Sequence, residues 1–519
     1  MFDLILANGL IVDGSGAEPR RGDVAVMGEI VVDTGDLANA ESRMRIDATG
    51  KIVCPGFIDS HSHGDAYMLI EPSAPSKAFQ GVTTDVVGNC GASAAPITDP
   101  MHMPSDWVDL EFPGTWRTVG EYRTLLETVK PLPNVVFLVG HNTVRRSAGA
   151  YDNRPPTAEE MACMSRLVEQ AMNDGARGLS TGLIYPPGRF SKTDEIVALA
   201  RVAARQGGVY CSHMRHEGAG LLDAIAETLA IGEAADIPVQ ISHLKTSGQG
   251  NWGLIDAALE AIETARGKGR PVHADRYPYI ASHTSLTVVF PDWALEGTID
   301  TRRARLSNPA QRARLRADLF GNAGARDWGA ITVGSTHHPD NRRFQGRLLT
   351  DVAAMLGLDP VDAILHMAET DAMRTSAFFA GMCEKNMTRI LALPWVMIGS
   401  DASIRAPWGP LSEDHPHPRT YGTFARFLRM ALDGQTVPLP EAVRKMTALP
   451  AEKFGLTDRG LIAKGKKADI AVIDPEQVRD RSTFAEPHQL AQGVVALAIN
   501  GELAIADGEL TGRRSGRFL

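Results

Sequence analysis

Hydrophobic and polar residues alternate near both ends of the chain in the pattern that is typical of β-strands. Short apolar runs separated by Asn-Gly and Gly-Glu turns fill residues 2–36, and similar runs recur at residues 468–478 and 494–510. A β-rich start and a β-rich end surround a middle of different character. We therefore predict one small β domain to which both ends of the chain contribute.

The middle of the chain alternates between short apolar runs and amphipathic segments. Helical periodicity is clear at residues 157–175 and 220–237. Eight strand–helix units in succession predict an α/β fold in which parallel strands close into a (β/α)8 barrel, whereas a doubly wound open sheet is the alternative. The apolar runs are residues 52–59, 82–88, 134–141, 176–183, 208–216, 238–245, 271–279 and 395–403.

One connection in this series is much longer than the others. Residues 280–394 are too many for a single crossover helix, so they predict an insertion before the last strand, which would cover the barrel mouth as a lid. We expect residues 1–54 to form the first part of the β domain and residues 55–435 to form the barrel with its insertion. Residues 436–519 would then supply a closing helix and the second part of the β domain.

The composition narrows the class of protein. The 519 residues, 44% of them hydrophobic, can bury a large core, and a net charge of −9 does not favour binding to nucleic acid or to an anionic membrane surface. Five scattered cysteines fit a reducing compartment better than a disulfide framework. The first residues lack a basic n-region, and no apolar run approaches the ~20 residues that span a bilayer. We expect a soluble cytoplasmic protein without nucleic-acid or membrane partners.

Side chains that bind metals follow the apolar runs at the points where strands would end. His61 and His63 are two positions apart, so their side chains would face the same way. Functional residues gather at the carboxyl ends of barrel strands, and imidazole, thiolate and carboxylate groups all bind Zn²⁺. A turn histidine, a buried apolar cysteine or a helix N-cap would explain any one of these residues, but their succession favours a metal centre. The candidates are His61, His63, Cys90, His213, His243 and Asp401.

A set of eight motifs makes the chemistry more specific. A His-x-His pair after a strand marks only a superfamily, whereas the cysteine in GNCG and the YPPG, YPY and HPR motifs mark a subgroup. Together the motifs resemble the N-acyl-D-amino-acid deacylases (D-aminoacylases) of the amidohydrolase superfamily over nearly the whole chain. The resemblance implies a (β/α)8 barrel with a β-sandwich assembled from both termini. The motifs are PGFIDSHSHGD, GVTTDVVGNCGAS, GLSTGLIYPPG, HMRHEG, ISHLKTSG, DRYPYIAS, GSDAS and HPRTYGTF.

The resemblance also implies a distribution of zinc ligands. A tightly held zinc would be bound by Cys90, His213 and His243, and a second, weaker site would use His61, His63 and Asp401, with Cys90 able to bridge the two. Many relatives bridge two metals with a carboxylated lysine on the fourth strand. The corresponding run, residues 176–183, contains no lysine, which is consistent with the cysteine instead.

Roles in catalysis and in substrate binding follow from the same resemblance. Asp401 would take a proton from the attacking water and return it to the leaving amine, and Tyr185 would donate a hydrogen bond to the carbonyl oxygen as it becomes an oxyanion. Lys245, Tyr277 and Arg419 would hold the α-carboxylate of the amino acid. The loop at residues 402–418 is longer than the family pattern and carries two histidines, a change that would reshape the pocket or move Arg419.

The segment after Tyr279 bears on the side chain that the substrate carries. It contains no arginine or lysine before Arg302, so a second carboxylate on the substrate would find no cation there. His283 stands where a second serine is expected and is a further substrate-binding candidate. An apolar lining predicts a preference for hydrophobic D-amino acids, and the alternative is that this lining belongs to the core of the insertion. The apolar residues are Leu286, Val288, Val289, Phe290 and Trp293.

These observations predict a zinc-dependent enzyme that hydrolyses N-acyl-D-amino acids to a carboxylate and a free D-amino acid. One alternative is a related enzyme that cleaves a cyclic amide, a urea or a xenobiotic amide, because fold and metal site would be shared. A second alternative, a non-catalytic metal-bearing scaffold, does not explain a complete ligand set together with Asp401. The expected partner is a small N-acyl amino acid, and the sequence leaves open whether the chain forms a homo-oligomer.

Overall fold

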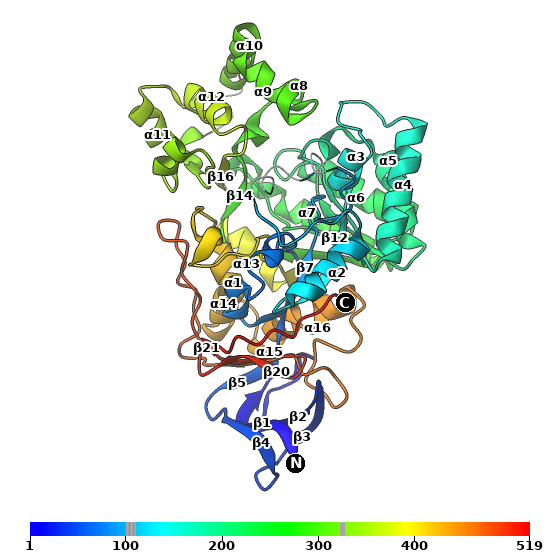
Figure 1. Ribbon diagram of the computed structural model, residues 1–519, viewed down its shortest axis with the longest axis vertical. Coiled ribbons are helices and arrows are strands. Elements are labelled where there is room, and N and C mark those ends of the chain that lie inside the picture. Colours follow the sequence, from blue (N-terminus) through cyan, green and yellow to red (C-terminus); the bar gives the residue numbers. More distant parts are fainter. Residues whose placement is uncertain (100–102, 104–106, 108–109, 322–326) are drawn as a thin grey trace.

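Three regions follow one another from bottom to top in the computed structural model (Figure 1). Strands from both chain ends lie at the bottom of the view, parallel strands with their helices fill the centre, and an insertion stands at the top. The structure describes residues 1–99, 103, 107, 110–321 and 327–519. The part of the predicted insertion at residues 322–326 lies outside the described residues.

The two ends of the chain meet in one nine-stranded sheet. β1 pairs with β5 in parallel, and β5 pairs with β18 from the C-terminal part in antiparallel orientation. Leu4, Val53 and Val472 belong to one buried apolar cluster of this sheet, so both chain ends share a core. The strands are β1 (Phe2–Ile11), β2 (Arg20–Met27), β3 (Ile30–Gly35), β4 (Ser42–Asp47), β5 (Ile52–Pro55), β18 (Ile470–Ile473), β19 (Val494–Ile499), β20 (Glu502–Ala506) and β21 (Glu509–Leu510).

A strand lies in every one of the eight apolar runs of the middle region. The first run is divided at Gly56, so that β5 joins the terminal sheet and only β6 joins the parallel strands. A Cβ atom at Gly56 would lie 2.2 Å from the side chain of Thr83, and this close approach requires glycine. The parallel strands are β6 (Phe57–Asp59), β7 (Val82–Val87), β8 (Asn134–Phe137), β9 (Val139–Gly140), β10 (Gly178–Gly182), β11 (Val209–His213), β12 (Val239–Ile241), β13 (Val272–Arg276) and β17 (Val396–Ile398).

The parallel strands pair in two series that adjoin each other at two places. The series are β6-β7-β8 and β9-β10-β11-β12-β13-β17. Only Leu138 separates β8 from β9, and its amide donates a hydrogen bond to the Val87 carbonyl (2.9 Å). At the other junction, the Ser60 amide donates to the Ile398 carbonyl (3.4 Å). β6 therefore lies beside β17, and the first and last strands of the middle region are neighbours.

Amphipathic helices follow most of the parallel strands, and those between residues 119 and 267 bury their apolar faces in one cluster. The predicted helices at residues 157–175 and 220–237 are observed as α4 and α6. Thr157 caps α4, since its side chain accepts a hydrogen bond from the Glu160 amide and its own amide donates one to the Glu160 carboxylate. Leu199 of α5 and Ile225 of α6 are fully buried in this cluster. The helices are α1 (Pro75–Ala78), α2 (Val119–Val129), α3 (His141–Ser147), α4 (Ala158–Asn173), α5 (Thr193–Ala204), α6 (Leu221–Ala235), α7 (Ile255–Gly267), α13 (Glu384–Ala392), α14 (Arg419–Leu432), α15 (Leu439–Met446) and α16 (Ala448–Lys453).

The insertion between β13 and β17 has a sheet and a core of its own. Its antiparallel strands pair in the order β14-β16-β15. Leu286, Val289 and Phe290 are buried in its core with Leu306 and Leu315 of the following helices. The elements are β14 (Ala281–Ser285), α8 (Asp292–Leu295), α9 (Ile299–Ser307), α10 (Pro309–Gly321), β15 (Ile331–Val333), α11 (Leu349–Leu356), α12 (Pro360–Thr370) and β16 (Ser376–Ala380).

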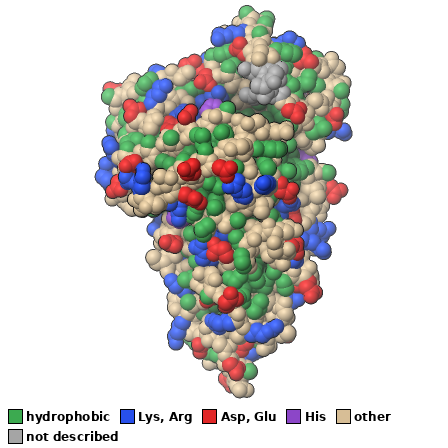
Figure 2. Space-filling view, turned by 180° about the vertical axis from the view of Figure 1, so that it is seen from behind, with side chains coloured by type: hydrophobic (Ala, Val, Ile, Leu, Met, Phe, Trp, Pro, Cys, Tyr) green, Lys and Arg blue, Asp and Glu red, His purple; other side chains and the backbone are tan. Residues whose placement is uncertain are grey.

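The surface seen from behind carries charges of both signs. Basic and acidic side chains are intermingled over this face, and neither sign forms a large continuous area (Figure 2). Within the described residues, none of the helices combines the length and the hydrophobicity that crossing a membrane requires.

Candidate metal centre

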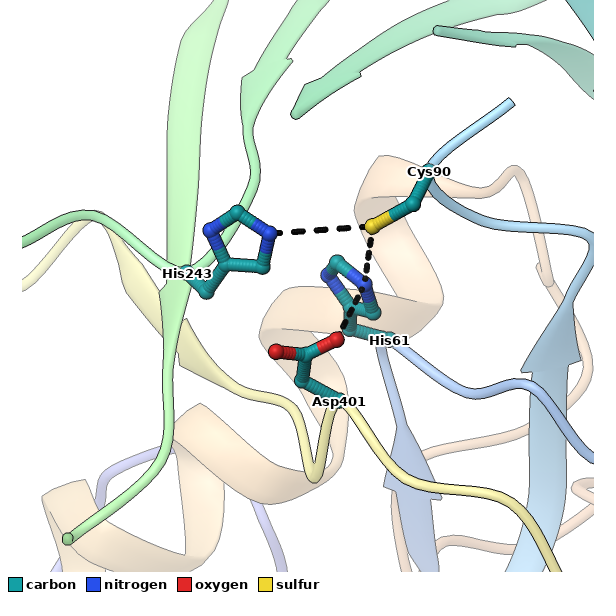
Figure 3. Close-up of side chains that lie close together, drawn as sticks. All are labelled: His61, Cys90, His243 and Asp401. Atoms are coloured by element: carbon teal, nitrogen blue, oxygen red, sulfur yellow. Dashed lines mark hydrogen bonds and ion pairs between the residues drawn. The ribbon is translucent and has the colours of Figure 1, made fainter. Parts of the chain in front are cut away.

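Four of the predicted ligands point toward one another at the carboxyl ends of the parallel strands (Figure 3). His61 follows β6, Cys90 follows β7, His243 follows β12 and Asp401 follows β17. One donor atom from each of the four lies within 4.8 Å of the others, and all four residues are buried. Residues far apart in the sequence therefore form one compact donor set.

The distances within this set are those of side chains that share one centre. Cys90 Sγ lies 3.2 Å from His61 Nε2 and 3.6 Å from His243 Nε2. His61 Nε2 lies 3.2 Å from Asp401 Oδ1. Zinc prefers a set of thiolate, imidazole and carboxylate donors, so the residues present fit this metal.

The other two predicted ligands, His213 and His63, adjoin the same set. His213 Nδ1 is 2.8 Å from His243 Nε2, and His63 Nε2 is 3.1 Å from Asp401 Oδ1. Among the described residues, His213 Nε2 is buried without a hydrogen-bond partner. The structure thus brings all six predicted ligands together, with His213 beside Cys90 and His243 and with His63 beside His61 and Asp401.

Three of these residues have a left-handed backbone. The φ angles are 51° at Cys90, 38° at His243 and 50° at Asp401. A non-glycine residue in this region costs about 1–3 kcal/mol and is retained where the surroundings demand it. The Asp401 turn is held by its own amide, which donates a hydrogen bond to the His61 carbonyl (2.8 Å). Backbone strain is therefore concentrated at residues whose side chains form the centre.

Charges inside the centre stabilise its anionic groups. Burial opposes ionisation of Cys90, but the nearby charges of His61 and His213 outweigh it and hold the pKa of the thiol well below its usual value. Burial likewise opposes ionisation of Asp401, and the charges of Arg419 and His243 hold the pKa of that carboxyl well below its usual value. Both side chains are therefore ready to bind a cation.

The side chains predicted to bind a carboxylate line the same centre. Arg419, at the start of α14, is buried, and its Nη1 lies 2.7 Å from Asp401 Oδ2. Lys245 Nζ lies 2.8 Å from His243 Nδ1 and is paired with Glu217. The guanidinium of Arg419 stacks on the ring of Tyr277, 4.6 Å from its centre. The long loop at residues 402–418 thus leaves Arg419 facing the centre.

Tyr185 lies beside the candidate ligand His213, with 4.9 Å between the ring centres. The Thr284 hydroxyl donates a hydrogen bond to the Tyr185 oxygen (2.9 Å), which leaves the phenol proton for another acceptor. Burial and the charge of Cys90 raise the pKa of Tyr185 well above its usual value. Tyr185 therefore remains a hydrogen-bond donor over the whole range in which an enzyme works.

The chain is similar over its whole length to enzymes of one superfamily. A family model described as "Amidohydrolase family" matches residues 45–505. The chain belongs to the amidohydrolase family. D-aminoacylase from Alcaligenes xylosoxydans xylosoxydans is 36% identical over 521 residues, which cover 100% of this chain and 97% of that protein. N-acyl-D-glutamate deacylase from the same organism is 36% identical over 519 residues, which cover 100% of this chain and 96% of that protein.

A solved structure extends the similarity to the fold of this amidohydrolase. The crystal structure of N-acyl-D-glutamate deacylase from Bordetella bronchiseptica, in complex with zinc and a phosphonate inhibitor that mimics the tetrahedral intermediate, has a TM-score of 0.85 and 34% identity. The match covers 100% of this chain and 99% of that one. The α/β fold is therefore shared with a zinc-containing deacylase.

Two acidic residues that the sequence analysis did not select support the ligands of this amidohydrolase. Asp275, fully buried at the end of β13, lies 3.0 Å from His61 Nδ1 and accepts a hydrogen bond from the His243 amide (2.8 Å). Glu217 lies 2.8 Å from His243 Nδ1 and, with His213 and His243, forms a second group of potential ligands. His61 Nδ1 thus has an acidic acceptor that fixes the orientation of its ring, and His243 Nδ1 lies between Glu217 and Lys245.

A buried lysine holds the backbone that carries the ligands of β6 and β17. Lys77 Nζ is 2.6 Å from Asp59 Oδ2 and 3.3 Å from Asp85 Oδ1. It also donates hydrogen bonds to the hydroxyls of Ser62 and Ser400 (3.1 Å each). Burial lowers the pKa of Lys77, but the two carboxylates outweigh it and raise that pKa above its usual value. A single cation therefore joins the turns that contain His61, His63 and Asp401.

The predicted side-chain pocket needs a correction. Leu286, Val289 and Phe290 pack inside the core of the insertion, so the alternative assignment applies to them. Val288 and Trp293 are only partly buried against that core. An apolar run does not by itself reveal which apolar surface it will meet, and here the insertion's own helices supplied that surface.

Proposed function

We propose that this amidohydrolase hydrolyses the amide bond of N-acyl-D-amino acids, releasing a carboxylate and a free D-amino acid. The observation that carries the proposal is the Arg419–Asp401 pair at the centre of the ligand set (2.7 Å). It puts a group suited to bind a carboxylate next to a group suited to move a proton. The relatives named D-aminoacylase and N-acyl-D-glutamate deacylase support the same substrate class.

We propose zinc as the metal. Cys90, His213 and His243 would hold a tightly bound ion, because they supply one thiolate and two imidazoles within one buried cluster. His61, His63 and Asp401 would form a second, weaker site, since two imidazoles and a carboxylate adjoin there. When bound, zinc supplies Lewis-acid activation of the scissile carbonyl and of the attacking water.

The protein's own groups would move the protons and stabilise the developing charge. Asp401 is ionised and would accept the proton of the water, then return it to the leaving nitrogen. Tyr185 keeps its proton and would donate a hydrogen bond to the carbonyl oxygen as negative charge develops on it. Lys245, Tyr277 and Arg419 would hold the α-carboxylate and so orient the amide toward Asp401.

We propose a preference for hydrophobic side chains on the substrate. A second carboxylate requires a buried cation, and the segment between Tyr279 and Arg302 supplies neither arginine nor lysine. His283, a proposed substrate contact, lies 2.9 Å from the Ser376 hydroxyl. Burial and the charges of Arg419 and Arg405 lower the pKa of His283 to about 3, so it is neutral. A neutral imidazole offers no ionic partner to a glutamate-like or aspartate-like side chain.

We infer that the parallel strands close into a (β/α)8 barrel and that the terminal sheet folds into a β-sandwich. The hydrogen bond from Ser60 to Ile398 supports closure, because it joins the first strand to the last. We propose domain limits at residues 1–54, 55–435 and 436–519, with the insertion as a lid. A small-molecule substrate and a cytoplasmic location, without nucleic-acid or membrane partners, complete the proposal.

Hydrolysis of a cyclic amide, a urea or a xenobiotic amide is less favoured by the site. Such substrates carry no free α-carboxylate, and the buried Arg419 would then lack a role beside Asp401. A non-catalytic scaffold would have no need for a proton acceptor within the ligand set.

The experiment that tests the proposal compares N-acetyl-D-leucine with N-acetyl-L-leucine after zinc has been supplied. We expect release of leucine from the D-enantiomer and little from the L-enantiomer. Asp401→Asn should retain the tightly bound zinc but lose turnover by a factor of about 10² or more, because an amide cannot accept the proton. Asp433→Asn, at the exposed end of α14, is the matched control and should leave turnover unchanged. Equal rates on the two enantiomers, or native turnover in Asp401→Asn, would refute the proposal.

A further inference from the structure

Arg276 is a buried cation that forms no ion pair within the described part of the chain. It ends β13 with 1% of its surface exposed, and its Nη2 donates a hydrogen bond to the Tyr279 carbonyl (2.7 Å) and contacts Met382 Sδ (3.0 Å). Among the described residues, neither Nε nor Nη1 has a hydrogen-bond partner. A buried charge is normally paired, because an unpaired charge loses its hydration without compensation.

The neighbouring cations, by contrast, already have acidic partners. Arg419 is paired with Asp401, and Lys245 is paired with Glu217. Burial lowers the pKa of Arg276 below its usual value, and the charge of Glu217 opposes this shift only in part, because Glu217 is shared with Lys245 and His243. Of the three basic groups around the proposed carboxylate site, Arg276 alone therefore carries a charge without a dedicated counter-ion in the described part of the chain.

Tyr277 connects Arg276 to that site. The guanidinium of Arg276 stacks on its ring at 4.3 Å from the centre, and the guanidinium of Arg419 stacks on the same ring at 4.6 Å. The Tyr277 hydroxyl is buried and has no partner among the described residues. Two cations thus fix the orientation of one buried phenol.

The gap beside Arg276 offers no place for a small anion that would balance its positive charge. The gap that Arg276 lines together with Lys245 and Thr246 is too narrow to hold a water molecule. This gap therefore has no room for an anion that would balance the charge of Arg276.

We propose that Arg276 is a positioning residue that makes the carboxylate site selective for anionic substrates, by holding Tyr277 and by leaving one positive charge for the substrate to neutralise. This inference rests on the proposed function, because the missing anion is the α-carboxylate of an N-acyl amino acid. The role is specific: Arg276 contributes to binding of the charged carboxylate and not to the chemistry at the amide.

The test compares an anionic substrate with its neutral counterpart, N-acetyl-D-leucine with N-acetyl-D-leucinamide. In Arg276→Met, we expect KM for N-acetyl-D-leucine to rise about tenfold or more with kcat changed less than about threefold. For the neutral amide, kcat/KM should change less than about threefold. Arg276→Lys should recover most of the loss, because it restores the charge. Arg302→Met is the control. It removes a part-buried arginine of α9 whose Nε also lacks a hydrogen-bond partner among the described residues, and it should leave kcat and KM for both substrates unchanged.

Folding and function are separated by two further measurements. Zinc content and thermal unfolding of each variant show whether the site is intact. If Arg276→Met does not fold, Arg276→Gln decides in its place, since glutamine keeps a donor for the Tyr279 carbonyl without the charge. Failure of both neutral variants to fold would make the role structural and overturn the inference. Equal losses on the two substrates would overturn the inference about Arg276 but leave the proposed function in place. A wild-type enzyme that hydrolyses no N-acyl-D-amino acid would overturn both.

Discussion

Arg419 Nη1 lies 2.7 Å from Asp401 Oδ2, so the group proposed to bind the substrate carboxylate is paired with the group proposed to move the proton. Both side chains are buried, and each raises the preference of the other for its charged form. A substrate carboxylate that reaches Arg419 would share this cation with Asp401. Substrate binding and the basicity of Asp401 are therefore coupled through one guanidinium.

Removal of the guanidinium tests this coupling. Arg419→Met should raise KM for N-acetyl-D-leucine about tenfold or more, because a charge-assisted contact to the carboxylate is lost. N-acetyl-D-leucinamide, which has no carboxylate, should be affected least. Steady-state kinetics on both substrates provides the measurement. Arg429→Met, which breaks the Arg429–Asp433 pair at the other end of α14, is the control. Equal losses on the two substrates would remove Arg419 from carboxylate binding.

Loss of the thiolate should empty the proposed tight site. We expect Cys90→Ala to lose its tightly bound zinc and nearly all activity, because no neighbouring side chain replaces a sulfur ligand. Elemental analysis of the purified protein measures the zinc content. Cys163→Ala removes a thiol from α4, away from the centre, and should keep the native zinc content. Native zinc content in Cys90→Ala would show that the ligand assignment is wrong.

The buried lysine beneath the ligand turns should dominate local stability. Lys77→Met leaves Asp59 and Asp85 buried without their cation and should lower the free energy of unfolding by about 3–5 kcal/mol. Adding Asp85→Asn to this variant should recover part of the loss, because one uncompensated charge is removed. Urea denaturation of the three proteins is the measurement, with Lys268→Met, at the exposed end of α7, as the control. A Lys77→Met variant as stable as the wild type would contradict the role of this network.

The neutral state of His283 gives a prediction about pH. Because its pKa is lowered to about 3, protonation begins far below the usual value of 6.5. The ratio of kcat/KM for N-acetyl-D-glutamate to that for N-acetyl-D-leucine should therefore stay low and constant between about pH 8 and pH 6. A ratio that rises as the pH falls through this range would show that His283 becomes a cation and binds the side-chain carboxylate of acidic substrates. A ratio above one at any pH would refute the hydrophobic preference.

The clustering of the candidate ligands could be predicted from the sequence because each one follows an apolar run directly. His61, His243 and Asp401 stand at the carboxyl ends of separate strands, and parallel strands bring such ends to one place. The two acidic residues that contact the candidate ligands were harder to predict from the sequence. Asp275 and Glu217 lie inside quoted motifs, but their roles depend on contacts to His61 and His243 that only the assembled strands create.

The side-chain pocket shows where sequence reasoning reaches its limit. Leu286 and Phe290 are apolar and follow the YPY motif, yet they face the helices of the insertion. Burial of an apolar side chain is non-directional, so the sequence near it does not specify its partner. The unpaired charge of Arg276 was equally hidden, because the pairing of Lys245 and Arg419 with acids is a property of the folded chain.

Titration of the metal-free enzyme with zinc tests the central claim most directly. The wild-type protein is stripped with a chelator, zinc is returned in small steps, and release of D-leucine from N-acetyl-D-leucine is measured at each step. The account predicts no hydrolysis without metal, a rise that reaches full activity near about one zinc per chain, and no response in Cys90→Ala. Hydrolysis by the metal-free protein, or no hydrolysis at any zinc concentration, would contradict it.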